Sequence, residues 1–414
     1  MPSSETVEIT GHLIDSGILS LVLNDIKEYG GDYVIEHIDV GHDRSDYSHA
    51  TLTVRAADDE ALQRLLMRVQ TRGVNQVDPG EAATAPAESD GVFPDGFYST
   101  TNLATKVHLD GRWVAVDNPE MDCGLLVEER DGALGVRTIP MSDVRAGMRL
   151  VVGADGVEVA TPQEVRTGGT FGFMESDVSS EKPQAVLVRQ VADGMRQARE
   201  RGEKVLWVGG PGIVHTGAAP AMVALVEAGF VDVLFAGNAL ATHDIEAALY
   251  GTSLGVDLTQ GRGVDHGHEH HIRAINTIRR AGSITAAVEQ GVLTGGIMHA
   301  LVRRGGVWVL VGSVRDDGPL PDVLTDVLEG QRAMRAALPG VGFCVMVATT
   351  LHSVATGNIL PASVPLVCVD INPATVTKLA DRGSSQARGI VTDVGLFLEQ
   401  LAHELVPSYV PGGR

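Results

Sequence analysis

The sequence predicts an α/β protein whose C-terminal half is a parallel sheet with helices on both faces. Three observations carry this prediction. The chain has 414 residues, of which 44% are hydrophobic, so it can bury a large core. Its 49 glycines against only 4% aromatic residues suit many tight strand-to-helix turns. From about Pro183 onward, short apolar runs alternate with helical patterns, as in buried parallel strands joined by helices.

Residues 1–78 follow the order strand, helix, two strands, helix, strand, which is the order of a ferredoxin-like α+β domain. The first helical stretch carries apolar residues at spacings of three and four. The segments, in order, are VEITGHL, ILSLVLNDIKEYG, DYVIEHIDVG, HATLTVRAA, DDEALQRLLMRVQTRG and NQVD. The next stretch, 79–90, is rich in Pro, Ala and acidic residues and predicts a linker.

Residues 91–175 predict a small β-rich unit, because turn signals recur at LDGRW, RDGAL and ADGVE. A connection over 173–183 leads to a predicted Rossmann-like domain, residues 183–414. Its expected strands are apolar runs that each precede a turn: KVLWVGG (204–210), VDVLFAG (231–237), VWVLVGS (307–313), FCVMVAT (343–349) and PLVCVD (365–370). In such a sheet, ligands bind beyond the carboxyl ends of the strands, so we expect the functional residues there.

Charge and cysteine content exclude several classes of protein. The formal net charge of −21 and the pI near 5.0 repel phosphate backbones, which disfavours nucleic-acid binding. Three cysteines provide no disulfide framework and indicate a reducing compartment. The N-terminal residues lack the pattern of a signal peptide, and no apolar run approaches the ~18 residues of a membrane span. We therefore expect a soluble, cytoplasmic protein without a membrane partner.

Asp370 ends the apolar strand 365–370, about 20 residues after the turn at Thr349, the usual separation between a phosphate-binding turn and a ribose-binding acid. A carboxylate there accepts both ribose hydroxyls and repels a 2′-phosphate, which predicts NAD rather than NADP. The alternative is that Asp370 merely begins the loop before the next helix. The glycine fingerprint is missing from TTLHSVATGN, and its nearest match, GGPGIVHTG, has His215 in place of the third glycine. Backbone amides at a helix N-terminus can still bind pyrophosphate.

Polar residues also follow the other predicted strands, where a closed core would not accommodate them. They are Asn238, His243 and Asp244 after strand 231–237, Arg315, Asp316, Asp317 and Asp322 after strand 307–313, and Asp393 near the C-terminus. One such residue could be a helix cap, but several at successive strand ends indicate a shared cleft.

The stretch DHGHEHH contains four histidines: His266, His268, His270 and His271. The second and the fourth could share a helical face and bind a metal. The segment also has the pattern of a polar loop that opens a helix, and we predict no metal site. Cys123 could be a nucleophile beside His215 or His352, but no spacing links them and a buried structural cysteine is the commoner case.

Long motifs spread along the chain point to one family: GHLIDSGIL, DGVFPDGFYSTTN, NPEMDCG, HTGAAPA, GNALATHDIEAALYGTSLGVD, AINTIRRAGSI, SVRDDGPLPDV, TTLHSVATGN and VDINPATVTKLADRGSSQARGIVTDVG. Over about residues 6–400 the sequence resembles the archaeal-type, NAD-dependent ornithine cyclodeaminases. These enzymes are similar to the C-terminal part of the cyanobacterial arginine dihydrolase/ornithine cyclodeaminase fusion and include the LOR/SDH conserved region. The preceding domain of the fusion has no counterpart here, so arginine hydrolysis is not implied.

The resemblance implies conversion of L-ornithine to L-proline and ammonia, in proline biosynthesis and arginine/ornithine catabolism, with tightly bound NAD recycled in each turnover. It implies NAD contacts from the matching motifs, namely Asn238, Ala239, Asp316, Thr350, Leu351, His352, Asp370, Asp393 and Val394. For proton transfer we favour Asp316 or Asp244, with His352 and His243 as rivals. Arg315 is the candidate partner of the substrate carboxylate. Asn102 and Glu120 are further candidates, or turn residues of the β unit.

Two alternatives remain open at this point. One is an NAD-dependent amino-acid dehydrogenase related to the saccharopine or lysine enzymes, which would release NADH in proportion to product. The other is a non-catalytic, amino-acid-sensing protein that binds NAD and in which the ferredoxin-like domain is the sensor. By analogy with other NAD-binding α/β proteins we expect a homo-oligomer, either a dimer or a tetramer.

Overall fold

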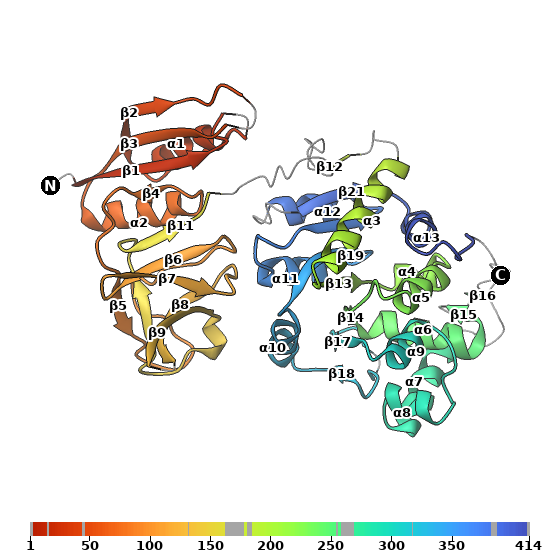
Figure 1. Ribbon diagram of the computed structural model, residues 1–414. Helices are drawn as coiled ribbons and strands as arrows, with labels where there is room; N and C mark the ends of the chain where they lie inside the picture. The colour runs from red at the N-terminus through yellow and green to blue at the C-terminus, as the bar shows by residue number, and fades with distance from the viewer. Residues whose placement is uncertain are drawn as a thin grey trace. The chain divides into compact units, whose positions relative to one another are not determined.

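In the computed structural model the chain forms two units, Met1–Arg166 with Asn358–Ser363, and Thr167–Gly357 with Val364–Arg414 (Figure 1). The structure describes residues 3–14, 16–43, 46–130, 132–161, 178–179, 184–253, 256–257, 269–316, 318–381 and 387–411. The predicted connection 173–183 lies outside these ranges except for two residues. Among the helices in the described ranges, none is both long and apolar enough to cross a lipid bilayer.

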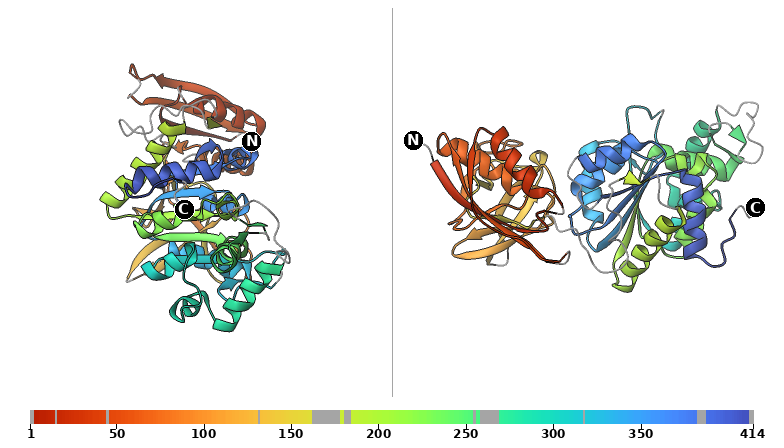
Figure 2. Two further views of the ribbon diagram at one scale, coloured as in Figure 1. Left: turned by 90° about the vertical axis from the view of Figure 1, so that its right-hand side faces the viewer. Right: turned by 90° about the horizontal axis from the view of Figure 1, so that it is seen from above.

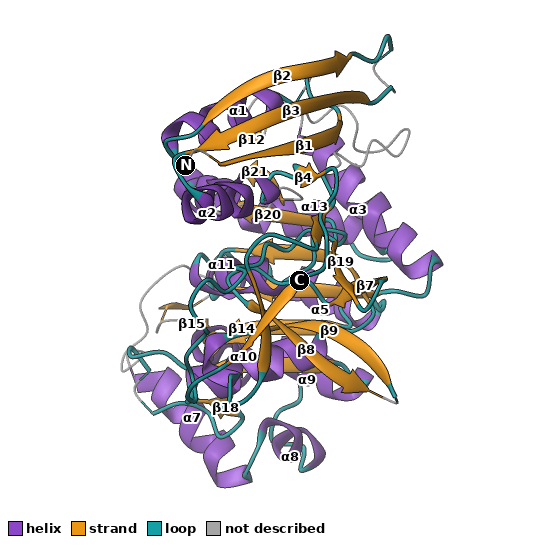
Figure 3. Cartoon of the chain, turned by 90° about the vertical axis from the view of Figure 1, so that its left-hand side faces the viewer, coloured by secondary structure: helices purple, strands orange, loops and turns teal. Residues whose placement is uncertain are grey.

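The first unit begins with a four-stranded antiparallel sheet in the order β2-β3-β1-β4 (Figure 3). Alternate residues of β3 are buried, and they form one core with the apolar faces of α1 and α2. The elements are β1 (Ser3–Gly11), α1 (Ile18–Glu28), β2 (Asp32–Asp39), β3 (Ser48–Ala56), α2 (Asp59–Gln70) and β4 (Asn75–Gln76). The predicted ferredoxin-like order of elements is confirmed.

A second sheet follows in the order β11-β6-β7-β9-β8-β10-β5, antiparallel except between β7 and β9. Its strands are β5 (Ala83–Pro86), β6 (Thr105–Leu109), β7 (Arg112–Asp117), β8 (Gly124–Arg130), β9 (Ala133–Ile139), β10 (Arg149–Val152) and β11 (Val157–Val159). The stretch 79–90, predicted as a linker, instead contributes β5. It pairs with β10 at the edge of the sheet, where Pro86, the last residue of β5, is tolerated because an edge strand can do without one ladder hydrogen bond.

The second unit is built on a parallel sheet with strand order β12-β21-β20-β19-β13-β14-β17-β18. The strands are β12 (Val178–Ser179), β13 (Lys204–Gly209), β14 (Val233–Gly237), β17 (Val307–Val311), β18 (Val323–Leu324), β19 (Val341–Val347), β20 (Leu366–Asp370) and β21 (Ala387–Val391). All five predicted strands are present. From β17 to β21 the order, numbered along the chain, is 3-2-1-4-5-6, that of the Rossmann fold.

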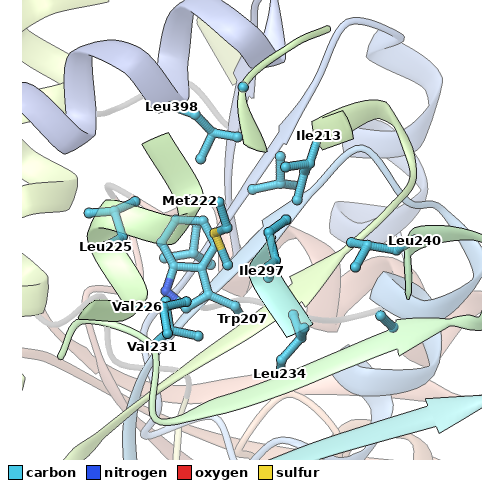
Figure 4. Close-up of a cluster of buried hydrophobic side chains, with 14 of the residues drawn as sticks. Trp207, Ile213, Met222, Leu225, Val226, Val231, Leu234, Leu240, Ile297 and Leu398 are labelled. Carbon is cyan, nitrogen blue, oxygen red and sulfur yellow. The ribbon is translucent and has the colours of Figure 1, made fainter. Parts of the chain in front are cut away.

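Helices lie on both faces of this sheet (Figure 2). They are α3 (Gln184–Glu200), α4 (Gly212–His215), α5 (Ala219–Glu227), α6 (Asn238–Tyr250), α7 (His270–Ala281), α8 (Ile284–Glu289), α9 (Ile297–Arg304), α10 (Val327–Ala337), α11 (Leu351–Ile359), α12 (Pro373–Asp381) and α13 (Val394–Leu405). A short hairpin, β15 (Thr252–Ser253) and β16 (Val256–Asp257), follows α6. The core centres on Trp207 of β13, surrounded by side chains of α5, α9 and α13 (Figure 4). The indole N–H of Trp207 donates to the carbonyl of Phe230 at 2.8 Å.

Candidate functional site

The switch point of the parallel sheet lies between β13 and β19, where successive connections turn in opposite directions. The two turns that follow these strands are in direct contact. A Cβ on Gly210 would lie 1.8 Å from the carbonyl oxygen of Ala348, and one on Gly212 would lie 2.9 Å from the Ala348 Cβ. Ala348 itself has a positive φ of 54°, a conformation that costs about 1 kcal/mol without glycine. Because Gly210 and Gly212 have no side chain, the two turns can pack directly against each other at this edge of the sheet.

The residues predicted to contact the cofactor all follow the carboxyl ends of strands in this one sheet. Parallel strands have their carboxyl ends at the same edge, so the fold brings these segments to one side of the sheet. They are Asn238 and Ala239 after β14, Asp316 after β17, Thr350, Leu351 and His352 after β19, Asp370 at the end of β20, and Asp393 and Val394 after β21.

Asp370 is the last residue of β20 and is 9% exposed. Its Oδ1 accepts the backbone N–H of Asn372 at 2.8 Å, which fixes the turn into α12. Burial, together with the nearby charge of Asp370, raises the pKa of the Cys368 thiol to about 12. The hydroxyl of Thr350, which directly precedes α11, lies 2.8 Å from that of Thr375 in the first turn of α12. An acidic side chain is thus held rigidly beside the switch point.

On the other side of the switch point, His352 and Asp316 lie at the ends of β14 and β17. A Cβ on Gly237 would lie 3.3 Å from His352 Cε1, so the ring covers the end of β14. Burial lowers the pKa of His352, and the charge of Asp316 opposes this effect. The Oδ2 of Asp316 accepts the backbone N–H of Ser313 at 2.7 Å, which folds the loop after β17 back on itself.

Asn238 joins the start of α6 to the loop that follows β17. Its side-chain oxygen accepts the backbone N–H of Leu320 at 3.0 Å and the hydroxyl of Thr242 at 3.2 Å. Arg315 is exposed in the same loop. Asp317 lies outside the described residues. Asn238 therefore positions this loop, including the segment that carries Asp316, against the carboxyl end of β14.

Asp393 caps α13 and places the start of this helix near the switch point. Its Oδ1 accepts the backbone N–H of Leu396 at 2.8 Å, as expected of an N-cap. A Cβ on Gly395 would lie 3.1 Å from the Cβ of Thr216, which directly follows α4. The N-terminus of α13, with Val394, therefore lies against the turn that leaves β13.

Asp244, a predicted proton carrier, is 1% exposed and is bound to protein amides at both oxygens. It accepts the backbone N–H of Ile297 and that of Met298, each at 2.8 Å, and so caps α9. Burial raises its pKa to about 6, and these two hydrogen bonds act in the opposite direction. Capping of α9 by both carboxylate oxygens therefore accounts for the burial of Asp244.

A cluster of histidines around Glu246 was only partly singled out by the sequence. Glu246 has a fully buried side chain, and His243 Nδ1 lies 2.8 Å from its Oε2. His215, His270 and His271 lie close by. The H-x-x-E spacing on one helix was the available signal. Among the described residues no group of three or more side chains is arranged to hold a metal ion, and His266 and His268 lie outside them.

Asn102 and Glu120, the candidates outside the Rossmann-like domain, are both buried in the first unit. The amide of Asn102 donates to the carbonyl of Leu360 at 3.1 Å, within the segment 358–363 that belongs to this unit. The hydroxyl of Thr100 donates to the carbonyl of Glu120 at 2.6 Å. Cys123 is buried in the same unit. Their described bonds hold turns of the β-rich part together.

The strand order and the closely packed turns at the switch point define a protein of the Rossmann class. Three family models match the chain: ArgZ-like arginine dihydrolase C-terminal, Rossmann fold, over 189–401; ArgZ-like C-terminal, first region, over 104–188; and LOR/SDH bifunctional enzyme conserved region over 4–103. The ornithine cyclodeaminase of Methanothermobacter thermautotrophicus is 50% identical over 97% of this chain and 98% of its own length. The chain belongs to this family of archaeal ornithine cyclodeaminases and ArgZ-like proteins.

Solved structures agree with this family. The apo structure of ArgZ, a cyanobacterial arginine dihydrolase, superposes with a TM-score of 0.84 at 35% identity, over 98% of this chain and 58% of that one. A LOR/SDH protein of Methanococcus maripaludis has a TM-score of 0.74 at 47% identity, over 80% of this chain and all of that one. A ternary complex of AgrE with ornithine and NAD+ has a TM-score of 0.53 at 38% identity, over 98% of this chain and 57% of AgrE.

Proposed function

We propose that this chain is an NAD-dependent ornithine cyclodeaminase that converts L-ornithine to L-proline and ammonia. Relatives from archaea that are 44–50% identical over nearly their whole length are named ornithine cyclodeaminases. AgrE, which is 38% identical in its matching part, was solved with ornithine and NAD+ together. The observation that carries the proposal is the buried carboxylate of Asp370, which lies beside a switch point where two glycine-containing turns pack together.

The residues at the sheet edge fit NAD. Gly210 and Gly212 let the turn after β13 pack closely against Ala348, and backbone N–H groups at this edge would face the pyrophosphate. Asp370 would accept both hydroxyls of a ribose, and its charge would repel a 2′-phosphate. The first turn of α11, with Thr350, offers backbone N–H groups to phosphate oxygens. When bound, NAD supplies a hydride acceptor and donor, so the overall reaction has no net redox change.

The cofactor would cross the switch point. Asp370 ends β20 on one side of it, whereas Asn238 and Asp316 follow β14 and β17 on the other. If the adenosine ribose is held at Asp370, the opposite end of the cofactor lies over β13, β14 and β17. The substrate then binds near the end of β14, where His352 covers the backbone.

For the substrate, we propose roles for the polar residues that follow β14 and β17. Asp316 would attract the ammonium groups of ornithine, because it is only half-buried and bears a negative charge close to His352. Arg315, exposed in the same loop, would pair with the substrate carboxylate. Asp244, predicted as the alternative to Asp316 for proton transfer, has both oxygens bound to α9, which favours a positioning role instead.

We also propose that the protein acts as a cytoplasmic homo-oligomer in proline biosynthesis and arginine/ornithine catabolism. Strand β2 lies at the edge of its sheet. It leaves Val34, Ile35 and Ile38 each at least 40% exposed. An exposed apolar edge strand is a common site of association between copies, as a dimer or tetramer.

Incubation of the purified protein with L-ornithine, with and without added NAD+, tests the proposed function. Proline, ammonia and the absorbance of NADH are followed together. We expect proline and ammonia in equal amounts with no accumulation of NADH. Accumulating NADH with an oxidised product would assign the chain to the amino-acid dehydrogenases. Bound NAD without any turnover would support a sensing protein, which should then gain thermal stability from its ligand.

A further inference from the structure

His243 lies toward the carboxyl edge of the parallel sheet, the edge at which the proposed cofactor residues also lie. Helix α9 ends at Arg304 and only two residues separate it from the start of β17, so its C-terminus lies at the amino edge of the sheet. Its N-terminus, at Ile297, therefore points toward the carboxyl edge. Asp244 binds that N-terminus, and His243 precedes Asp244 on α6. His243 and the cofactor residues thus occupy the same edge of one sheet.

Glu246 holds the His243 ring in one orientation. The Nδ1–H of His243 donates to Glu246 Oε2 at 2.8 Å, while the hydroxyl of Thr252 donates to Oε1 at 2.9 Å. Because the hydroxyl hydrogen of Thr252 is donated to Glu246, the Thr252 oxygen accepts a hydrogen bond from His270 Nδ1 at 2.8 Å. The carboxylate therefore selects the His243 tautomer whose Nε2 can take a proton. Within the described part of the chain, that Nε2 makes no hydrogen bond.

His215 connects this pair to solvent. Its ring centroid lies 4.8 Å from that of His243, and its Nδ1 lies 2.7 Å from Ser253 Oγ. The residue is exposed, whereas His243 is only 8% exposed. Burial lowers the pKa of His215, and the charge of His243 lowers it further, whereas the negative charge of Glu246 acts to raise it. The described groups that face His243 are thus His215 from α4, His271 from α7, at 6.3 Å between centroids, and Glu246.

A fully buried carboxylate is a costly structural element. Desolvating Glu246 costs several kcal/mol, roughly, unless its partners compensate. An apolar side chain of similar size would hold α6 to β15 without this cost. A buried carboxylate that orients a histidine, with a second histidine leading to solvent, is an arrangement suited to proton transfer.

We propose that His243, oriented by Glu246, exchanges protons with the amino groups of the substrate, and that His215 passes these protons to and from solvent. This inference rests on the proposed cyclodeaminase function. The N–H bond of the substrate ammonium breaks, its electron pair stays on nitrogen, and the proton moves to His243 Nε2. The nitrogen lone pair is then available for hydride loss at Cα or for ring closure. The proton is returned to the departing ammonia, so the steps balance.

The test compares His243→Gln with His403→Gln, which changes an exposed histidine in the last turn of α13. Glutamine preserves an N–H donor for Glu246 but cannot act as a base. We expect His243→Gln to lower kcat at least about 100-fold, with NAD content and melting temperature close to wild type. The His403→Gln protein should match wild type. Turnover of His243→Gln within a few-fold of wild type, with an unchanged pH profile, would overturn the inference.

Glu246→Gln provides a second readout that does not depend on the first variant folding. Loss of the carboxylate makes the His243 imidazolium harder to form, so the rise of kcat/KM with pH should move to lower pH. A purely structural role would lower the melting temperature without moving this rise, and that result would also overturn the inference. If wild type releases neither proline nor ammonia, the proposed function itself is wrong, which the His243 variants alone could not show.

Discussion

The raised pKa of Asp244 makes the stability of the Rossmann unit depend on pH. Asp244 is buried, and burial raises its pKa from 3.8 to about 6. The folded state therefore keeps this proton over a range in which the unfolded state has lost it. The stabilising contribution is complete below pH 3.8 and is lost as the pH rises through the folded-state pKa, near 6.

The size of this effect follows from the difference between the two pKa values. A shift of about two units corresponds to about 3 kcal/mol of unfolding free energy, lost between roughly pH 4 and pH 7. Asp244→Asn cannot titrate. Its amide has only one acceptor oxygen, so one of the two N–H groups of α9 loses its partner, at a cost of about 1–3 kcal/mol at every pH. This loss is constant, whereas wild type loses its own stabilisation as Asp244 ionises. The variant should therefore be less stable than wild type in acid and nearly equal to it at neutral pH.

Urea unfolding of both proteins at several values between pH 4 and pH 7 measures this difference. Fluorescence of Trp207, which is fully buried in the core of the Rossmann unit, reports on the relevant transition. The matched control is Asp326→Asn, which removes an exposed carboxylate that caps α10 through the N–H groups of Leu328 and Glu329. The difference in unfolding free energy between wild type and Asp326→Asn should not fall comparably over this pH range. A constant difference between wild type and Asp244→Asn over this range would refute the reasoning.

Two further predictions concern the cofactor site. Asp370→Asn keeps an acceptor for the turn into α12 but removes the charge, so we expect NAD to bind about 10- to 100-fold more weakly and discrimination against NADP to fall. Equilibrium dialysis with each cofactor checks this, and unchanged affinities would exclude Asp370 from the ribose site. Gly210→Ala would place a Cβ 1.8 Å from the oxygen of Ala348, so β13 and β19 must separate at the switch point. If this variant retained NAD and its melting temperature were unchanged, the close packing of Gly210 against Ala348 would not matter for the cofactor site.

Local patterns in the sequence were enough to predict the elements and the class of fold. Continuous apolar runs of strand length identified all five central strands, because strands buried on both faces need no polar alternation. The alternation of strands and helices in residues 1–78 predicted the topology of the first sheet. Asp370 was singled out because a carboxylate at the end of a buried strand has few local explanations, and its role at the ribose stays a prediction. The stretch 79–90 was misassigned because Pro and Ala dominate its composition, while its pairing with β10 is a long-range contact.

The site itself depends on contacts between residues that are distant in the chain. By itself, the sequence determined which segments are strands and which polar residues follow them, since both depend on local hydrophobicity and turn chemistry. Only the tertiary structure showed that Gly210 meets Ala348, because strand order is set by how the crossover helices pack. It also showed that Asp244 caps α9, whereas His243, its neighbour, pairs with Glu246 near His215. Adjacent side chains on a helix point in different directions, so only packing decided which environment each one enters.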